Sequence, residues 1–344
     1  MSAPVRVGIL GLGSIGRTHA AALSRLDGAA QVVAASGGSA AALAEAGWPA
    51  AEHMTDAQEL AARSDLDIVL VATPSDLHAG HAAAAIDAGH DVVVEKPLAT
   101  STADATALLR LAEERGRTVY PVAQRRLEPQ HRHIRAQLDA GTLGHPVLGE
   151  IFVHWHRDAA YYAAAPWRSR MPAGGSLTNQ GLHSVDLLSW FLGPITAVTA
   201  QTATLGNGGE AEDTATVTLE AASGALGVAV TTTATPPGDP AVLSLRTTSG
   251  AIELAHTDVV RWEVDEAPPP PSTSSAGAGS ADPAAIGLAG HVDVWRDVLD
   301  ARAAGRPPSV RAVDGWRTVA LIDAAYRSAR TGTRVTVPSD PDTA

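Results

Sequence analysis

Hydrophobic positions in the first third of the chain fall into short runs separated by segments of helical length. The runs are 5–10, 31–35, 68–72, 91–94 and 118–122, and helices are expected near 14–26, 39–46, 56–63, 76–88 and 102–115. Repeated alternation of strand and helix predicts parallel strands with helices on both faces of the sheet. The runs are continuously apolar, which indicates a doubly wound sheet buried on both sides.

The pattern changes after residue 122. One helix is expected at 129–140, before Gly141, and another at about 179–192, before Gly193-Pro194. Thr- and Val-rich runs separated by turn signals then indicate antiparallel hairpins. These runs are 196–204, 213–219, 225–233, 241–247 and 259–264, with a further strand at 151–157 and helices near 289–304 and 313–330.

The chain is therefore predicted to be α/β with two domains. The first, residues 1–122, holds the parallel sheet, and the second, residues 123–340, is an α+β domain with a large, open, mostly antiparallel sheet. The helix at 313–330 is the one element of the second domain that could pack back near the first. A Pro-, Ser-, Gly- and Ala-rich stretch at 268–284 is read as a surface loop, with a substrate lid as the alternative.

Composition narrows the class of protein. A length of 344 residues favours two domains, and 45% hydrophobic against 18% charged residues is typical of a globular chain. A net charge of −12 argues against nucleic-acid and anionic-membrane partners. The absence of cysteine excludes disulfides, thiolate metal sites and a cysteine nucleophile, and fits a cytoplasmic location. We expect neither a signal peptide nor a membrane span.

A glycine-rich turn directly follows the first run. Gly11, Gly13 and Gly16 form the pattern Gly-x-Gly-x-x-Gly, with Ser14 and Ile15 at the start of a helix. The first glycine permits a tight turn, the second lets the backbone approach a pyrophosphate, and the third allows close packing of helix and strand. The helix start offers free N–H groups to phosphates. In this strand–turn–helix context the motif predicts a dinucleotide site.

The residue that selects the cofactor is expected at the end of the second strand. An acidic side chain there would bind the ribose of NAD, but the sequence has Ser36, followed by Gly37-Gly38-Ser39. No acid repels a 2′-phosphate, and no arginine follows to bind one. The sequence leaves NAD and NADP open and leans towards NADP.

Glu95-Lys96-Pro97 ends the fourth apolar run. Ligands bind at the carboxyl ends of strands in such sheets. A lysine at this edge can hydrogen-bond a substrate hydroxyl and stabilise a developing alkoxide. The alternative is a solvated lysine at a strand end.

A third candidate lies at 174–186, where a glycine pair leads into a helix. Asn179, His183 and Asp186 are spaced so that they share one helix face. A histidine in the first helical turn has its pKa lowered by the dipole, which favours a neutral base. Such a group suits carbonyl–carbinol interconversion. The alternative is a histidine that caps or packs, and Asp186 would oppose the shift or orient the ring.

Together these motifs resemble the glucose–fructose oxidoreductase/inositol dehydrogenase (Gfo/Idh/MocA) family over nearly the whole chain. The matching residues are Gly11 to Gly16, Ala72-Thr73-Pro74 with His78, Glu95-Lys96-Pro97, Gln124-Arg125-Arg126, Trp167-Arg168, the 174–186 block and Ala325-Tyr326-Arg327-Ser328. The resemblance implies a Rossmann domain and an open sheet that often forms a dimer surface. It also implies hydride exchange between a nicotinamide and a carbinol carbon, usually of a sugar, cyclitol or related polyol.

The resemblance also implies roles for single residues. His183 becomes the acid/base, and Lys96 orients and polarises the reacting hydroxyl. Thr73, Pro74, His78 and Glu95 match positions along the cofactor, and Trp167-Arg168 lie near its nicotinamide end. Many relatives carry Asp where this chain has Asn179, and an amide binds substrate without taking a proton. Asn179 is therefore placed in the catalytic set with a role left open.

Several other residues keep two interpretations. His154 and His156 alternate on one strand, but no third zinc ligand is apparent, and His131 and His133 are weaker candidates still, so no metal is predicted. Arg126 either binds substrate or pairs with an acid. Aromatic residues that form either a sugar-binding wall or core are Tyr161, Tyr162 and Trp167.

The predicted function is an NAD(P)-dependent dehydrogenase or reductase that acts on a sugar-like polyol. The competing hypothesis is a non-catalytic sensor on the same fold, and retention of both Lys96 and His183 favours the enzyme. A flavin or methyl-donor enzyme fits poorly, because Ser36 stands where those sites need an acid. The open sheet has helices for one face only, which predicts a homodimer or homotetramer.

Overall fold

The computed structural model describes residues 3–206, 208–271 and 287–343. The chain divides into two compact units. The first consists of residues up to 124 together with 288–319, and the second of residues 125–287 together with 320–343. From residue 272 onward, the stretch expected to be a loop or lid lies outside the described residues.

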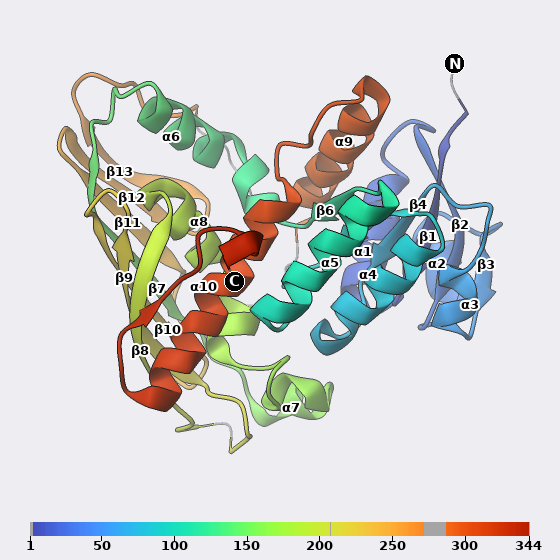
Figure 1. Cartoon of the computed structure of the whole chain (residues 1–344), viewed down its shortest axis with the longest axis horizontal. Helices are drawn as coiled ribbons and strands as arrows, with labels where there is room; N and C mark the ends of the chain where they lie inside the picture. Colours follow the sequence, from blue (N-terminus) through green and yellow to red (C-terminus); the bar gives the residue numbers. More distant parts are fainter. Residues whose placement is uncertain (1–2, 207, 272–286, 344) are drawn as a thin grey trace. The chain divides into compact units, whose positions relative to one another are not determined.

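The first unit contains a six-stranded parallel sheet in the order β3-β2-β1-β4-β5-β6 (Figure 1). This order reverses direction between β1 and β4, which is where Rossmann sheets bind dinucleotides. The strands are β1 (Val5–Leu10), β2 (Ala30–Ser36), β3 (Glu52–Met54), β4 (Ile68–Val71), β5 (Asp91–Val94) and β6 (Val119–Pro121). The helices are α1 (Ser14–Leu23), α2 (Ala40–Glu45), α3 (Ala57–Ala61), the 3-10 turn η1 (Ser75–Leu77), α4 (His78–Asp87), α5 (Thr102–Arg115) and α9 (Leu288–Ala304).

Burial explains the central strands. Every residue of β4 and β5 is buried, as the continuous apolar runs predicted. Strand β3 was not predicted, because its sequence Glu-His-Met is short and polar and only pairing with β2 makes it a strand.

Helix α9 belongs to the first unit, whereas the sequence placed residues 289–304 in the second domain. It packs against α1, and Trp295 is fully buried there. Helical periodicity shows that one face of the helix must be covered but not which sheet or helix covers it. The sequence pattern therefore could not assign α9 to the first unit.

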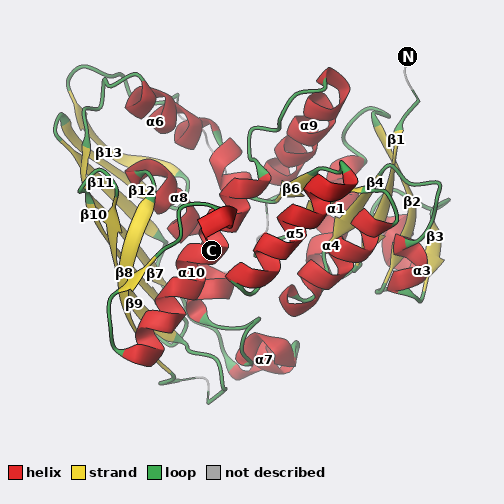
Figure 2. Ribbon diagram, in the orientation of Figure 1, coloured by secondary structure: helices red, strands yellow, loops and turns green. Residues whose placement is uncertain are grey.

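The second unit contains an eight-stranded sheet in the order β13-β12-β11-β7-β10-β9-β8-β14. All neighbouring strands are antiparallel except β7 and β10, which are parallel. The strands are β7 (Pro146–His154), β8 (Ile195–Ala203), β9 (Thr214–Ala221), β10 (Leu226–Thr232), β11 (Val242–Thr247), β12 (Gly250–Ala255), β13 (Asp258–Val264) and β14 (Val335–Thr336) (Figure 2). The helical elements are η2 (Gln124–Leu127), α6 (Pro129–Asp139), α7 (Ala159–Ala163), η3 (Pro166–Ser169), η4 (Ser176–Gly181), α8 (Leu182–Leu192), α10 (Ala312–Thr331), which spans both units, and η5 (Pro341–Thr343).

The α/β fold class is confirmed, with two additions in the second sheet. Strand β12 was not predicted, because glycine, alanine and glutamate, which have low strand propensity, make up most of it and it is defined by pairing with β11 and β13. The two-residue strand β14 exists only through its pairing with β8.

The two faces of the second sheet differ. Helix α8 packs on β7 and β10, and Ile151 and Ala229 of these strands are buried on that face. Side chains that point the other way, such as Phe152, Val228 and Val230, stay half-exposed. Among the described helices, none is long and apolar enough to cross a membrane.

Candidate active site

The glycine turn after β1 has the geometry that its three glycines predict. Gly11 has φ of +93°, a value that favours glycine. A side chain on Gly16 would meet the carbonyl oxygen of Gly11 at 2.0 Å, so helix α1 packs tightly on the turn. A side chain on Gly13 would meet nothing within 4 Å. The turn is thus closed on the protein side and open on the side where a pyrophosphate would bind.

The start of α1 is also free for an anion. Gly13 is its N-cap, no side chain caps it, and its first turn carries no acid. Backbone N–H groups and the helix dipole therefore point towards the open side of the turn. Ser36 ends β2 beside this turn and is buried, and its carbonyl oxygen accepts hydrogen bonds from the N–H groups of Gly11 and Leu12.

His78 joins the loops that follow β4 and β5. Its Nδ1 lies 2.7 Å from the carbonyl oxygen of Pro97, and its Nε2 lies 2.8 Å from that of Thr73. The ring is buried. His78 therefore holds the segment after Lys96 against the Thr73-Pro74 turn, and both of its ring nitrogens are engaged with protein.

Lys96 lies two residues after the end of β5 and is half-buried. Desolvation lowers the pKa of its ammonium, and the carboxylate of Glu95 opposes that shift. Glu95 itself is buried and accepts hydrogen bonds from His19 at 2.8 Å and from the backbone N–H of Lys96 at 2.9 Å. Lys96 is also the only lysine in a chain with 25 Lys and Arg residues, a signal that the motif analysis did not use.

In the second unit, the helix that carries Asn179 and His183 begins earlier than predicted. It opens at Ser176 with a π-helical turn, Ser176–Gly181, and continues as α8. The carboxylate of Glu212 accepts the N–H groups of Ser176 at 2.9 Å and Leu177 at 2.8 Å. π-Turns are rare and are found frequently at functional sites.

This start corrects the expectation for His183. His183 is the second residue of α8, but the helical segment begins at Ser176, so His183 does not lie in its first turn. The helix dipole acts within the first turn. It therefore acts on Glu212 rather than on His183. The sequence could not show this, because Glu212 lies 36 positions along the chain from Ser176.

Asn179 lies in a polar and aromatic neighbourhood. Its side-chain amide and that of Gln180 both donate to the hydroxyl of Tyr161, at 3.3 and 2.7 Å. The guanidinium of Arg157 lies 5.3 Å from the Tyr161 ring and donates to Gln180. Arg168 stacks at 4.1 Å on the same ring and donates to the Tyr161 carbonyl oxygen. Trp167, next to Arg168, belongs to this group through a 5.7 Å ring contact.

Arg126 had two predicted roles, and the structure shows one of them. Its guanidinium forms a buried two-point ion pair with Asp186, at 2.7 and 2.9 Å, and lies 5.4 Å from the ring of Trp190. Asp186 is thus the ion-pair partner of Arg126.

The remaining histidine candidates have structural contacts. His131 is buried, which lowers its pKa to about 4, and its Nδ1 lies 2.7 Å from the carbonyl oxygen of Arg125. His133 lies 2.9 Å from the carbonyl oxygen of Pro268. His154 packs on Phe152, and His156 forms a backbone bridge with Ala234.

Comparison with known proteins agrees with this picture. Residues 5–122 match a family model described as the oxidoreductase family with an NAD-binding Rossmann fold, and residues 131–253 match the GFO/IDH/MocA C-terminal domain. Inositol 2-dehydrogenase 1 of Saccharopolyspora erythraea is 30% identical over 97% of this chain and 96% of its own. The chain belongs to the Gfo/Idh/MocA oxidoreductase family. The predicted membership and the NAD-binding oxidoreductase class are confirmed at this level.

Two further proteins align over most of the chain. D-apiose dehydrogenase of Paraburkholderia graminis is 26% identical over 96% of this chain and 89% of its own. The dehydrogenase WlbA of Bordetella pertussis, solved with NADH and UDP-GlcNAcA, superposes with a TM-score of 0.87 at 28% identity, covering 98% of this chain and 99% of the other.

Proposed function

We propose that this protein is an NAD-dependent dehydrogenase of a carbinol group in a sugar, cyclitol or related polyol, with Lys96 and His183 as its catalytic residues. The observation that carries the proposal is the single lysine of the chain, placed at the carboxyl end of β5. All the other residues counted as lysine or arginine are arginines. An arginine would stay charged at any working pH, whereas a desolvated lysine can share or release a proton.

Each residue is assigned one task. Lys96 donates a hydrogen bond to the reacting hydroxyl and stabilises the negative charge that develops on its oxygen as the proton leaves. His183 accepts that proton during oxidation and returns it during reduction. NAD, when bound, supplies the hydride acceptor. Asn179 binds a neighbouring hydroxyl, because its amide hydrogen-bonds without taking a proton.

Two observations support a sugar-like substrate. The relatives named above are dehydrogenases of inositol and D-apiose, and the WlbA structure holds a nucleotide sugar. In this chain, Asn179 lies beside the aromatic ring and hydroxyl of Tyr161, together with the amide of Gln180 and the guanidinium of Arg157. Aromatic faces combined with amide and guanidinium donors suit a polyhydroxylated ring.

NAD is proposed as the working cofactor, although the sequence leaned towards NADP. The matching family model describes an NAD-binding fold. Ser36 is followed by Gly37 and Gly38, both in left-handed conformations, and this segment supplies no cation for a 2′-phosphate. Separate calorimetric titrations with NADH and NADPH test this choice. A lower Kd for NADPH would reverse it.

The catalytic assignment is tested with Lys96→Arg, Lys96→Met and His183→Asn in a screen of inositols, aldoses and UDP-sugars with NAD. We expect kcat to fall by at least about a hundredfold in each variant while the Kd for NADH changes little. Arg115→Gln, which removes a surface charge from the same unit, is the matched control. If the intact protein binds NADH but turns over no substrate in the screen, a sensor on this fold replaces the enzyme.

A second copy of the chain is proposed to cover the half-exposed face of the second sheet. Phe152, Val228 and Val230 lie side by side there, since Phe152 pairs with Val230 across β7 and β10. An apolar centre with Thr-rich neighbouring strands is typical of a protein–protein interface.

A further inference from the structure

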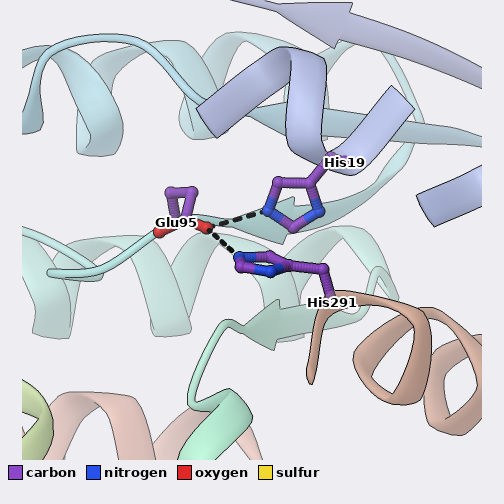
Figure 3. A group of neighbouring side chains, drawn as sticks. All are labelled: His19, Glu95 and His291. Atoms are coloured by element: carbon purple, nitrogen blue, oxygen red, sulfur yellow. Dashed lines mark hydrogen bonds and ion pairs between the residues drawn. The ribbon is translucent and has the colours of Figure 1, made fainter. Parts of the chain in front are cut away.

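The carboxylate of Glu95 is held by two histidines inside the first unit (Figure 3). His19, from α1, places Nε2 2.8 Å from Oε1, and His291, from α9, places Nε2 3.7 Å from the same oxygen. All three side chains are buried, and the two imidazole rings meet edge to face at 4.8 Å. Nothing in the glycine motif or in the Glu95-Lys96-Pro97 motif predicts this group.

Trp295 determines which nitrogen of His19 carries a proton. Its indole N–H donates to Nδ1 of His19 at 2.9 Å. An indole nitrogen can only donate, so Nδ1 must act as an acceptor and the proton of the neutral ring must lie on Nε2. Nε2 therefore donates to Glu95. Burial lowers the pKa of His19, which keeps the ring neutral. Burial alone would raise the pKa of Glu95, but the hydrogen bond from His19 and the neighbouring ring of His291 outweigh it and hold this pKa well below its usual value.

The same three residues have the composition of a metal site, with ligand atoms within 4.8 Å of one another. Two details argue against one. Ligands of a tetrahedral zinc ion lie about 3.3 Å apart, given bonds of about 2.0 Å, whereas His19 and Glu95 are at hydrogen-bonding distance. A metal on Nε2 would also force the proton of His19 onto Nδ1, where it would face the indole N–H of Trp295.

The other oxygen of Glu95 connects this group to Lys96. Oε2 accepts the backbone N–H of Lys96 at 2.9 Å. The carboxylate charge also opposes the loss of the Lys96 proton that desolvation favours. The titratable groups that face Glu95 are His19 and His291, and Lys96 follows it on the chain. The charge of the reacting lysine thus depends on a carboxylate whose state is fixed by residues of α1 and α9.

We propose that His19, with its tautomer set by Trp295, is a positioning residue that keeps Glu95 ionised and thereby keeps the Lys96 side chain charged for the reaction. The proposal rests on the catalytic role given to Lys96. Without the donor at Nε2, Glu95 would take up a proton in its buried site, and Lys96 would lose its proton at lower pH. A purely structural histidine would affect folding but not the titration of Lys96.

The single lysine makes this directly measurable. In the full chain labelled with [ε-13C]lysine, one NMR signal reports the titration of Lys96. We expect the midpoint to move to lower pH in His19→Leu and to move equally far in Glu95→Gln. In His19→Gln, whose amide can donate to Glu95, the midpoint should return towards the wild-type value. Trp295→Phe keeps an aromatic ring but removes the indole N–H that donates to His19, and it should give an intermediate shift. His90→Gln, which alters another buried histidine of the unit, is the matched control.

Turnover provides the second measurement. In His19→Leu the basic limb of the kcat/KM profile should move with the NMR midpoint, and kcat at pH 7.5 should fall about tenfold with an unchanged Kd for NADH. An unshifted midpoint in a folded His19→Leu or Trp295→Phe protein would overturn the proposal. So would binding of Co²⁺ or Zn²⁺ to the intact chain that His19→Leu abolishes. Lys96→Met separates this proposal from the proposed function. If Lys96→Met stayed active while the Lys96 midpoint still shifted in His19→Leu, the catalytic role of Lys96 would be wrong, but the effect of His19 on the titration of Lys96 would remain.

Discussion

The hydroxyl of Tyr326 donates to the carboxylate of Glu212 at 3.0 Å, inside the second unit. The same hydroxyl accepts a hydrogen bond from Thr178 at 3.0 Å, and Glu212 accepts the N–H groups of Ser176 and Leu177. Tyr326 comes from α10, near the C-terminus. Tyr326, which belongs to the C-terminal motif of the family, thus supports the helical turn that carries Asn179.

Glu212 should make stability depend on pH. Burial raises its pKa from 4.5 to about 7 despite the hydrogen bonds that favour ionisation. A raised pKa means that the folded protein binds the proton more tightly, so this stabilisation is complete below pH 4.5 and lost as the pH rises through 7. From pH 4.5 to 8 the free energy of unfolding should fall by about 3 kcal/mol relative to Glu212→Gln.

Urea unfolding of both proteins at several pH values measures this difference. Glu220→Gln, on the exposed part of β9, is the control and should follow the wild-type profile. Parallel profiles for the wild type and Glu212→Gln would show that the carboxyl does not titrate in this range.

Two alanine substitutions should separate folding from cofactor binding. A methyl group on Gly16 meets the carbonyl oxygen of Gly11 at 2.0 Å, so Gly16→Ala should cost on the order of 3 kcal/mol of stability. A methyl group on Gly13 meets nothing within 4 Å, so Gly13→Ala should fold almost as well as the wild type. It should nevertheless weaken NADH binding at least about tenfold, because the pyrophosphate needs that space.

Thermal unfolding and NADH titration of the two variants provide the test. The interpretation of the turn would be wrong if Gly13→Ala bound NADH normally.

The ion pair between Arg126 and Asp186 should matter for folding. Arg126→Met leaves Asp186 buried without its partner, and breaking a buried pair from one side typically costs about 3–5 kcal/mol. Replacing both partners, as in Arg126→Met with Asp186→Leu, should recover most of this loss. Urea denaturation measures it, with Arg334→Met in an exposed pair as the control. A single variant as stable as the wild type would instead favour the substrate role for Arg126.

The open face of the second sheet should be sensitive to charge. Val230→Arg places a cation beside Phe152, its neighbour across the sheet, and should convert an oligomer to monomers without unfolding them. Light scattering at micromolar concentration measures the mass. Leu77→Arg, at an exposed apolar residue of the first unit, is the control and should leave the mass unchanged. A wild-type protein that is already monomeric would contradict the proposed interface.

Local sequence determined most of the first unit and its cofactor turn. Continuous apolar runs identify strands buried on both faces, and the glycine spacing is a local constraint of backbone geometry, so both can be interpreted without knowing the fold. The position of Lys96 could also be predicted locally, because the apolar run before it marks where a strand of the parallel sheet ends. The order of the motifs was sufficient to recognise the family.

Tertiary structure decided what surrounds those residues. Glu212 caps the turn at Ser176 from 36 positions away, and Trp295 reaches His19 across 276 positions. Neither contact leaves a periodic signal, because a buried hydrogen bond needs only one donor and one acceptor and imposes no spacing on the chain. For the same reason the sequence misplaced α9, missed β12 and put His183 in a first turn that begins at Ser176 instead.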